Sequence, residues 1–260
     1  MTPMDYNLKK RAIRQRALLR LLEKTGYASV EELTAALSVT PQTIRRDIAD
    51  LSDSGKVRRY HGGAALASPI DPGTYRQRRV DKVDVKRRIA RRAAELVPNG
   101  ATLFLDAGST CEAVAEALAE RKGLKVVTYS LRAAMILMDR TDFTIAVPGG
   151  FVRHVDGSVI GDAMVEFVRR FRFDVAVIAV SGIEEDGSIG DDDQNEVDIV
   201  RVAIGQARSV MLVADSSKFH RAALVSLGSI TEVSDFVTDL PPDGALERVI
   251  GASGVRLHIA

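Results

Sequence analysis

Seven short runs rich in β-branched, aromatic and aliphatic residues recur after Gly100, and stretches with helical periodicity lie between several of them. The expected strands cover residues 102–105, 125–128, 144–147, 174–180, 209–213, 235–238 and 255–259. The expected helices cover residues 112–120, 131–138, 164–171 and 197–207. Alternation of this kind is typical of an open, largely parallel sheet with helices on its faces. We therefore predict an α/β fold for this part of the chain.

The charge of the chain is divided between its two parts. Residues 1–100 carry 21 Lys and Arg against 11 Asp and Glu, whereas residues 101–260 carry 15 against 24. Net charges of +10 and −9 thus lie behind a total of only +1. A basic part joined to an acidic one suggests that the first binds a polyanion, and nucleic acid is the first candidate. The alternative explanation of this charge asymmetry is a basic helix that only faces solvent.

Composition excludes several other classes of protein. Hydrophobic residues make up 46% of the chain and charged residues 27%, which excludes a disordered or fibrous chain. A single cysteine cannot form an internal disulfide, and the first residues lack the apolar core of a signal peptide, so we expect a cytoplasmic protein. The longest apolar run, residues 175–180, is too short to span a membrane.

Three short helices are predicted in the N-terminal part. The first covers residues 11–24, where apolar residues follow helical spacing. The second begins after Ser29, which stands three residues before Glu32 as in a capping box. The third begins at Thr40 and Pro41, a hydroxyl cap followed by proline in the first turn. Only a tight turn separates the second and third helices, which is the arrangement of a helix-turn-helix.

The third predicted helix carries side chains that can read DNA. In a helix-turn-helix this helix enters the major groove with its N-terminal residues at base edges. Gln42 can pair with adenine and an arginine with guanine, whereas Thr43 can contact a phosphate or a thymine methyl. A β-ribbon typical of a wing follows at residues 56–64, where contacts reach the DNA backbone or minor groove. The predicted DNA contacts are Thr40, Gln42, Thr43, Arg45 and Arg46 on the helix and Arg58, Arg59 and His61 on the wing.

Polar residues follow the predicted strands at their carboxyl ends, where ligands bind in open α/β sheets. Asp106 follows the first strand and leads through Gly108, Ser109 and Thr110 into a helix, whose amino end favours an anion. Four further strand ends carry Ser130, Gly150 with Arg153, Ser181 with Gly182, and Lys218. The two cations can offset a phosphate charge, and the first carboxylate can hold sugar hydroxyls. Singly, each residue has a structural alternative as a cap, turn or loop contact.

The chain resembles the DeoR family of bacterial transcriptional regulators in several motifs. The likeness is carried by TPQTIRRDI at residues 40–48 and HGGA at residues 61–64. Within that family it is most similar to the glycerol-3-phosphate regulon repressor type, through residues 97–104, 180–183 and 214–219.

The resemblance implies a division of labour along the chain. We place a winged helix-turn-helix at residues 1–65, a linker and basic helical segment at 66–97, and a sensor domain similar to ribose-5-phosphate isomerase at 98–260. The resemblance implies a non-enzymatic repressor that a phosphorylated sugar or glycerol-phosphate-like effector releases from operator DNA. The effector positions that match the family are Asp106, Gly108, Ser109, Thr110, Ser130, Gly150, Arg153, Ser181, Gly182 and Lys218. The chain departs from the family pattern at Tyr129 and Ser130, where relatives often carry two asparagines, and in a more acidic loop over residues 190–196.

Other readings of the sequence stay open beside this one. A sugar-phosphate isomerase with a basic extension would use Asp106 as a base and Lys218 as its partner, although the usual phosphate-loop and nucleophile motifs are absent from the sequence. The acidic residues 191–193 lack metal-binding spacing and are interpreted as an exposed loop, so we expect no metal and no cofactor. Cys111 is read as a packing residue or as a thiol activated by a helix start.

Two expectations concern packing and assembly. The basic helix expected over residues 76–96 can pack on the protein or lie beside DNA, and its pattern favours packing. The two-fold geometry of operators predicts a homodimer or homotetramer.

Overall fold

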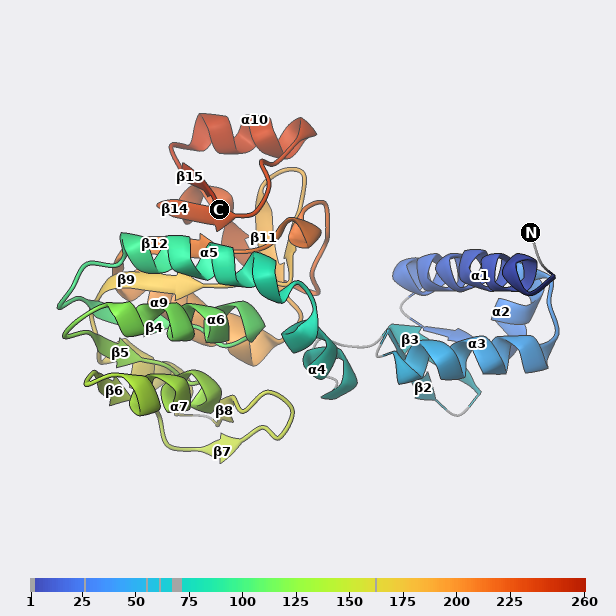
Figure 1. Ribbon diagram of the computed structural model, residues 1–260, viewed down its shortest axis with the longest axis horizontal. Helices are drawn as coiled ribbons and strands as arrows, with labels where there is room; N and C mark the ends of the chain where they lie inside the picture. The colour runs from blue at the N-terminus through green and yellow to red at the C-terminus, as the bar shows by residue number, and fades with distance from the viewer. Residues whose placement is uncertain (1–2, 26, 55, 61, 67–71, 162) are drawn as a thin grey trace. The chain divides into compact units, whose positions relative to one another are not determined.

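The computed structural model describes residues 3–25, 27–54, 56–60, 62–66, 72–161 and 163–260 (Figure 1). Contacts divide the chain into two compact units, Met1–Arg78 and Arg79–Ala260. Within the described ranges, no helix is both long and apolar enough to cross a membrane.

The N-terminal unit is a winged helix-turn-helix, as predicted. Its helices are α1 Pro3–Thr25, α2 Val30–Leu37 and α3 Pro41–Asp53, and its wing is the hairpin of β2 Val57–Tyr60 and β3 Gly63–Leu66. A third strand, β1 Tyr27–Ser29, pairs with β3 and was not predicted, because three residues carry too little pattern. The core contains Leu18, Leu22, Val30, Leu33, Ile44, Ile48, Leu51 and Val57.

Capping side chains determine where α2 and α3 begin. Ser29 Oγ accepts a hydrogen bond from Glu32 N at 3.1 Å, and Ser29 N donates to Glu32 Oε2 at 2.8 Å. Thr40 Oγ1 accepts from Thr43 N at 3.3 Å, with Pro41 in the first turn of α3. Each cap satisfies amide groups that the helix itself leaves without an acceptor. The predicted starts of both helices are confirmed.

The first predicted helix was too short. It begins at Pro3, not at Arg11. Proline is favoured in a first helical turn, and no glycine interrupts the segment that follows. Apolar periodicity marks only the part of a helix that packs against a core, so it missed this extension.

The single helix expected over residues 76–96 is also corrected, because it is two helices. These are α4 Pro72–Val80, which covers part of the expected linker, and α5 Val83–Leu96. The break lies at Lys82, whose φ of 52° is left-handed and therefore incompatible with a continuous helix. Hydrophobic periodicity carries no signal for such a backbone conformation.

The C-terminal unit is built on a seven-stranded parallel sheet of order β15-β14-β12-β9-β4-β5-β6. In chain order its strands are β4 Thr102–Leu105, β5 Lys125–Val127, β6 Thr144–Ala146, β9 Phe173–Ile178, β12 Ala207–Val213, β14 Asp235–Thr238 and β15 Arg256–Ile259. All seven expected strands are confirmed, with their bounds shifted by at most two residues. The α/β fold class is confirmed with them.

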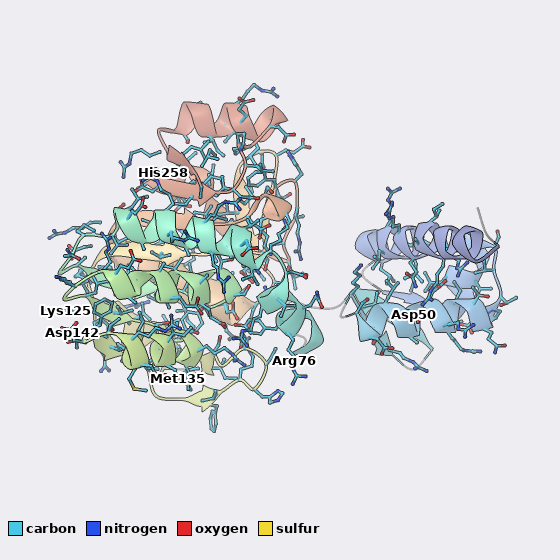
Figure 2. The ribbon with its side chains drawn as sticks, viewed as in Figure 1. Asp50, Arg76, Lys125, Met135, Asp142 and His258 are labelled. Carbon is cyan, nitrogen blue, oxygen red and sulfur yellow. The ribbon has the colours of Figure 1, made fainter. Side chains whose placement is uncertain are left out.

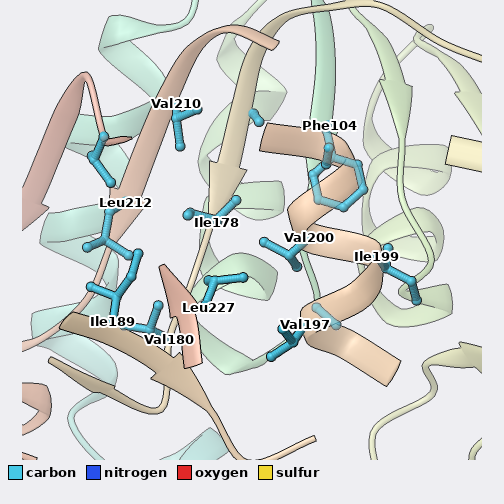
Figure 3. Packing of buried hydrophobic residues seen from close by; sticks show 14 of the residues in the cluster. Phe104, Ile178, Val180, Ile189, Val197, Ile199, Val200, Val210, Leu212 and Leu227 are labelled. Atoms are coloured by element: carbon cyan, nitrogen blue, oxygen red, sulfur yellow. The ribbon is translucent and has the colours of Figure 1, made fainter. Parts of the chain in front are cut away.

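Helices cover both faces of this sheet. The helices on one face are α5, α6 Ser109–Ala117 and α7 Leu131–Arg140, and those on the other include α8 Met164–Arg169 and α9 Gln194–Gln206 (Figure 1). Successive strand residues alternate between the two cores, so Leu103 packs on the first face and Phe104 on the second. Figure 3 shows Val200 of α9 beside Phe104 and Ile178 of the sheet. Because α5 contributes Ile89 and Ala93 to the first core, the packing expected for the basic helix is confirmed.

Smaller elements complete the unit. The structure adds α10 Gly244–Ser253, the hairpin of β7 Phe151–Val152 and β8 Val159–Ile160, and a small sheet of β10 Gly182–Ile183, β11 Ser188–Asp191 and β13 Val225–Ser229. The first three residues of α6 and of α9 were also missed. Both helices start three residues before their expected positions, because polar first turns hide the start from a hydrophobic pattern.

A buried ion pair joins α1 to α3 and yields the first prediction. Asp47 on α3 is 1% exposed, and its carboxylate accepts hydrogen bonds from both Nε and Nη2 of Arg14 on α1. Arg14→Met removes the partner of a buried charge and should destabilise the N-terminal unit by roughly 3 kcal/mol. Hydrogen exchange of the α1 and α3 amides in the full-length chain measures this loss.

Arg11→Met is the matched control. Arg11 pairs with Asp50 between the same two helices, but both side chains are at least one-third exposed. Its loss should cost less than about 1 kcal/mol. An equal loss of stability in the two variants would show that the buried carboxylate of Asp47 does not need Arg14 as its partner.

Candidate functional site

The outer face of α3 carries three side chains that were predicted to contact DNA. Ile44 and Ile48 are buried on the inner face of this helix, whereas Gln42, Arg45 and Arg46 are exposed. Among the described residues, no hydrogen bond or ion pair engages these three side chains. They are available for a partner outside the chain.

The hydroxyl groups at the start of α3 have a different role. Thr40 Oγ1 and Thr43 Oγ1 lie 2.9 Å apart, and the former also caps the helix. These two hydroxyl groups therefore position the amino end of α3. They are less free to bind DNA than the side chains of Gln42, Arg45 and Arg46.

The strands of the wing contribute one cation whose side chain is described. Arg59 in β2 is exposed and has no partner among the described side chains. The backbone of Arg58 pairs with Ala65, but its side chain lies outside the described residues, as does the whole of His61. The contacts expected from Arg58 and His61 stay predictions.

Asp106 occupies the middle of the carboxyl edge of the C-terminal sheet. It follows β4, and its carboxylate accepts hydrogen bonds from Ala107 N at 2.7 Å, Tyr129 Oη at 2.5 Å and Ala179 N at 3.0 Å. These donors follow β4, β5 and β9, so one side chain ties three strand ends together. The role expected for Asp106, holding sugar hydroxyls, is occupied by the protein's own donors in this structure.

The environment of Asp106 acts on its ionisation in two directions. It is 4% exposed, and burial raises its pKa to about 7, although the three hydrogen bonds lower it. The nearby charge of Asp191 adds to the rise. Tyr129, which replaces the asparagine expected from the resemblance, is thus a partner of this carboxylate.

The amino end of α6 follows directly. Gly108 precedes the helix with a φ of 109°, a conformation that favours glycine, and no side chain caps the helix there. Ser109 is half-buried and Thr110 is buried. The uncapped first turn at the carboxyl edge of a sheet is suited to an anion.

The other predicted positions serve mainly in loop contacts. Ser130 Oγ caps α7 by accepting from Ala133 N at 3.2 Å. Ser181 Oγ lies 3.2 Å from Asp191 Oδ1. Gly182 is required by close packing, because a Cβ there would lie 2.2 Å from the carbonyl oxygen of Arg221. Gly150 lies just before β7, and Lys218 is half-buried in a 3-10 turn.

Arg153 is surrounded by carboxylates. Its guanidinium pairs with Asp156, Asp193 and Glu196, and its side chain is 14% exposed. Burial and the charge of Asp191 raise the pKa of Glu196 to about 8, against the opposing effect of the guanidinium. The positive charge expected to offset a phosphate is therefore balanced by the protein here.

Residues 191–193 are not the exposed acidic loop that the sequence suggested. Asp193 is 8% exposed and caps α9 by accepting from Asn195 N at 2.9 Å. Asp192 Oδ1 accepts from Leu224 N at 3.1 Å. Sequence reasoning missed these residues because their partners lie on distant segments, and only an aspartate just before a helix was a local signal. Within the described ranges, no group of three or more His, Cys, Asp or Glu side chains could hold a metal ion.

Cys111 has no exposed surface, and burial raises the pKa of its thiol well above the ordinary value. It belongs to the core between the sheet and α6. A buried thiol with a raised pKa is a packing residue, so the structure decides between the two readings that the sequence left open.

Comparison with known proteins identifies two regions. Residues 14–69 match the DeoR-like helix-turn-helix domain, and residues 81–240 match the DeoR C terminal sensor domain. The glycerol-3-phosphate regulon repressor of Escherichia coli (strain K12) is 42% identical over 250 residues, which cover 96% of this chain and 99% of the relative. The HTH-type transcriptional repressor CsqR of the same organism is 38% identical over 240 residues, 92% of each chain.

Solved structures include more distant likenesses. Ribose 5-phosphate isomerase from Plasmodium falciparum matches 52% of each chain with a TM-score of 0.39 and 12% identity. Ribose 5-phosphate isomerase A from Methanocaldococcus jannaschii matches 54% of this chain and 55% of its own, with a TM-score of 0.40 and 17% identity.

The Asp106–Tyr129 contact yields a pH-dependent prediction. Because the folded-state pKa of Asp106 lies above that of an ordinary aspartate, its contribution to stability falls as pH rises from about 4 through about 7. Tyr129→Phe removes a donor that stabilises the carboxylate, so the pKa should rise further. The stability difference between variant and unmodified chain should reach about 1.5 to 3 kcal/mol above pH 7 and be smaller at pH 5.

Urea unfolding at pH 5 and pH 8 measures this difference, and carboxyl NMR follows the titration of Asp106 directly. In an Asp106→Asn background the same tyrosine substitution should show no pH dependence. A difference that is equal at both pH values would mean that the tyrosine does not act through the carboxylate.

Proposed function

The chain belongs to the DeoR family of transcriptional regulators, and we propose that a phosphorylated metabolite bound in its C-terminal unit releases its N-terminal unit from operator DNA. It is a DNA-binding regulator and not an enzyme, in keeping with relatives that are named repressors. We infer that it represses genes of carbohydrate or glycerol-phosphate metabolism. Chromosomal DNA as its partner would place it in the cytoplasm.

The observation that carries the DNA-binding part is the separation of paired from available arginines. Arg11 and Arg14 on α1 are engaged by carboxylates, whereas the described guanidinium groups on α3 and the wing are not. Arg16 and Arg20 on α1 are also exposed without a described partner, so the position of a guanidinium group on α3 or the wing counts beside its lack of a pair. A duplex supplies the dense negative charge that such groups lack inside the protein. The proposed contacts are Thr40, Gln42, Thr43, Arg45, Arg46, Arg58, Arg59 and His61. A homodimer or homotetramer would match the two-fold symmetry of an operator.

The proposed effector site lies at the carboxyl edge of the parallel sheet. The uncapped start of α6, with Gly108, Ser109 and Thr110, would accept the phosphate. Lys218 would supply positive charge from the neighbouring loop, while Asp106 and Arg153 would hold the strand ends and the start of α9 in place. The remaining positions of the site are Ser130, Gly150, Ser181 and Gly182. A phosphorylated sugar or a glycerol-phosphate-like compound supplies both the anion and the hydroxyl groups that such a site favours.

Two ion pairs provide a route from this site towards the DNA-binding unit. Arg79 Nε lies 2.9 Å from Glu112 Oε2 in the first turn of α6, and Lys82 Nζ lies 2.7 Å from Asp215 Oδ1 in the loop before Lys218. Both carboxylates are less than one-tenth exposed. Although burial opposes it, the Lys82 ammonium helps hold the pKa of Asp215 below its usual range. The two cations lie at the start of the C-terminal unit. A ligand that moves either the start of α6 or the loop of Asp215 would therefore alter the chain that follows the DNA-binding unit.

The effector proposal is tested with DNA selected from a random pool by the unmodified chain. Adding sn-glycerol 3-phosphate, or a series of sugar phosphates, should weaken binding about 5- to 150-fold, the usual range of allosteric coupling. Fluorescence anisotropy of the labelled duplex measures the response. Lys218→Ala should shift the response to higher ligand concentration without changing DNA affinity.

Lys125→Ala is the matched control. Lys125, labelled in Figure 2, begins β5 and therefore lies at the amino edge of the sheet, away from the proposed site. Its loss should leave the titration unchanged. If no phosphorylated compound alters DNA binding, or if the chain converts one to product without an effect on DNA, the effector proposal is wrong.

The route through Lys82 predicts uncoupling. Lys82→Met should keep DNA affinity yet reduce the effector response to less than about 3-fold, because the buried Asp215 loses its link to the chain between the units. Lys82→Arg should retain the response. Arg87→Met removes an exposed charge from α5, the helix that begins after Lys82. Arg87 pairs only with the exposed Asp84 among the described residues, so this variant should change nothing. The proposed route fails if Lys82→Met responds like the unmodified chain while its ligand affinity is unchanged.

A further inference from the structure

The exposed side chains of α3 do not all face the same way. An α-helix turns by about 100° per residue. Relative to the buried line through Ile44, Ile48 and Leu51, Gln42 and Arg46 lie nearly opposite, and Arg45 lies about a quarter of a turn to one side. Two of the side chains thus point straight away from the core, and the third leans along the surface of the unit.

The side towards which Arg45 leans is hollowed. A hollow of about 710 Å³ is lined by Val30, Glu31, Arg45, Ile48, Arg59, Gly62 and Gly63. It lies where the start of α2 meets the turn of the wing, a junction held by a 2.8 Å hydrogen bond from Val30 N to the Gly62 carbonyl oxygen. Two guanidinium groups from separate elements therefore border one depression.

The charge of this hollow is positive. Among its described lining residues the two arginines face a single carboxylate, Glu31, and no described ion pair neutralises either arginine. The two wing glycines carry no side chain that would fill the space. An anionic group that approaches between the helix and the wing would meet two donors at once.

We propose that Gln42 and Arg46 read bases in the major groove, and that Arg45 and Arg59 together hold a backbone phosphate in the hollow beside the wing. This assignment rests on the proposed binding of operator DNA and divides that function between residues. Direct readout needs side chains that project along the axis into the groove, whereas phosphate contacts come from the flanks of the recognition helix and from the wing.

The spacing of the two readers constrains the operator. Residues four apart on a helix lie about 6 Å apart along its axis, and base pairs are stacked about 3.4 Å apart. Glutamine favours adenine and arginine favours guanine in the major groove. The preferred site should therefore contain an adenine and a guanine within about two base pairs of each other, on either strand.

Binding selection from a randomised duplex pool, followed by affinity measurements at several salt concentrations, tests the assignment. Arg46→Ala should lose the guanine preference and weaken binding to the selected site about 5- to 150-fold, with a much smaller effect on unrelated duplexes. Gln42→Ala should lose the adenine preference. Arg45→Ala and Arg59→Ala should keep the whole motif, weaken binding to all duplexes alike, and each lower the slope of log affinity against log salt by about 1.

Lysine variants separate charge from geometry. Lysine keeps the positive charge but lacks the planar fork that pairs with guanine. Arg45→Lys should therefore bind nearly as the unmodified chain does, whereas Arg46→Lys should still lose discrimination at the guanine. Arg16→Ala removes an exposed charge from α1 and should alter neither the motif nor the salt slope.

Two kinds of failure are distinguishable. If Arg45→Ala erases a base preference, or Arg46→Ala keeps the motif intact, the assignment is overturned although the chain still binds DNA. If the unmodified chain, with unchanged circular dichroism, recovers no motif and ignores every duplex at low salt, the proposed function itself is wrong.

Discussion

Buried carboxylates engage several cations of this chain and so withdraw them from a polyanion. Asp47 engages Arg14 in the N-terminal unit, and in the C-terminal unit Asp215 engages Lys82 and a cluster of three acids surrounds Arg153. A buried carboxylate left without a partner is strongly destabilising, so these cations are bound into the fold. On the described surface of α3 and the wing, a small set of arginines has no ion pair with a carboxylate. The net charge of the first hundred residues is thus less informative than the way its cations are paired.

Much of the fold could be predicted from local patterns, and the parts that could not share a physical reason. The parallel strands and the caps at Ser29 and Thr40 are encoded within a few residues, because alternation and capping chemistry are local. The break at Lys82 has a left-handed backbone, and the side chain of this residue contacts Asp215, which is distant in the sequence. The burial of Asp193 likewise depends on Arg153, forty residues earlier in the chain.

The same distinction applies to the candidate site. The sequence placed polar residues at the right edge of the sheet because strand ends are recognisable, but it assigned ligand-binding roles to side chains whose nearest partners are protein groups. Asp106 is the clearest case, since its three donors come from residues that follow different strands. Such an arrangement links three strand ends through one side chain, so the proposed effector would meet groups that are already held in place. The acidic residues around Arg153 extend these side-chain contacts to the start of α9.

The outward face of α3 has an evolutionary consequence. Because Gln42 and Arg46 are exposed and form no described hydrogen bond or ion pair within the chain, replacing them should change stability by no more than about 0.5 kcal/mol. Substitutions at these two positions would therefore be tolerated by the fold. A duplicated copy of such a gene could thus acquire a new target sequence through one or two substitutions, while its C-terminal unit passed unaltered to its descendants.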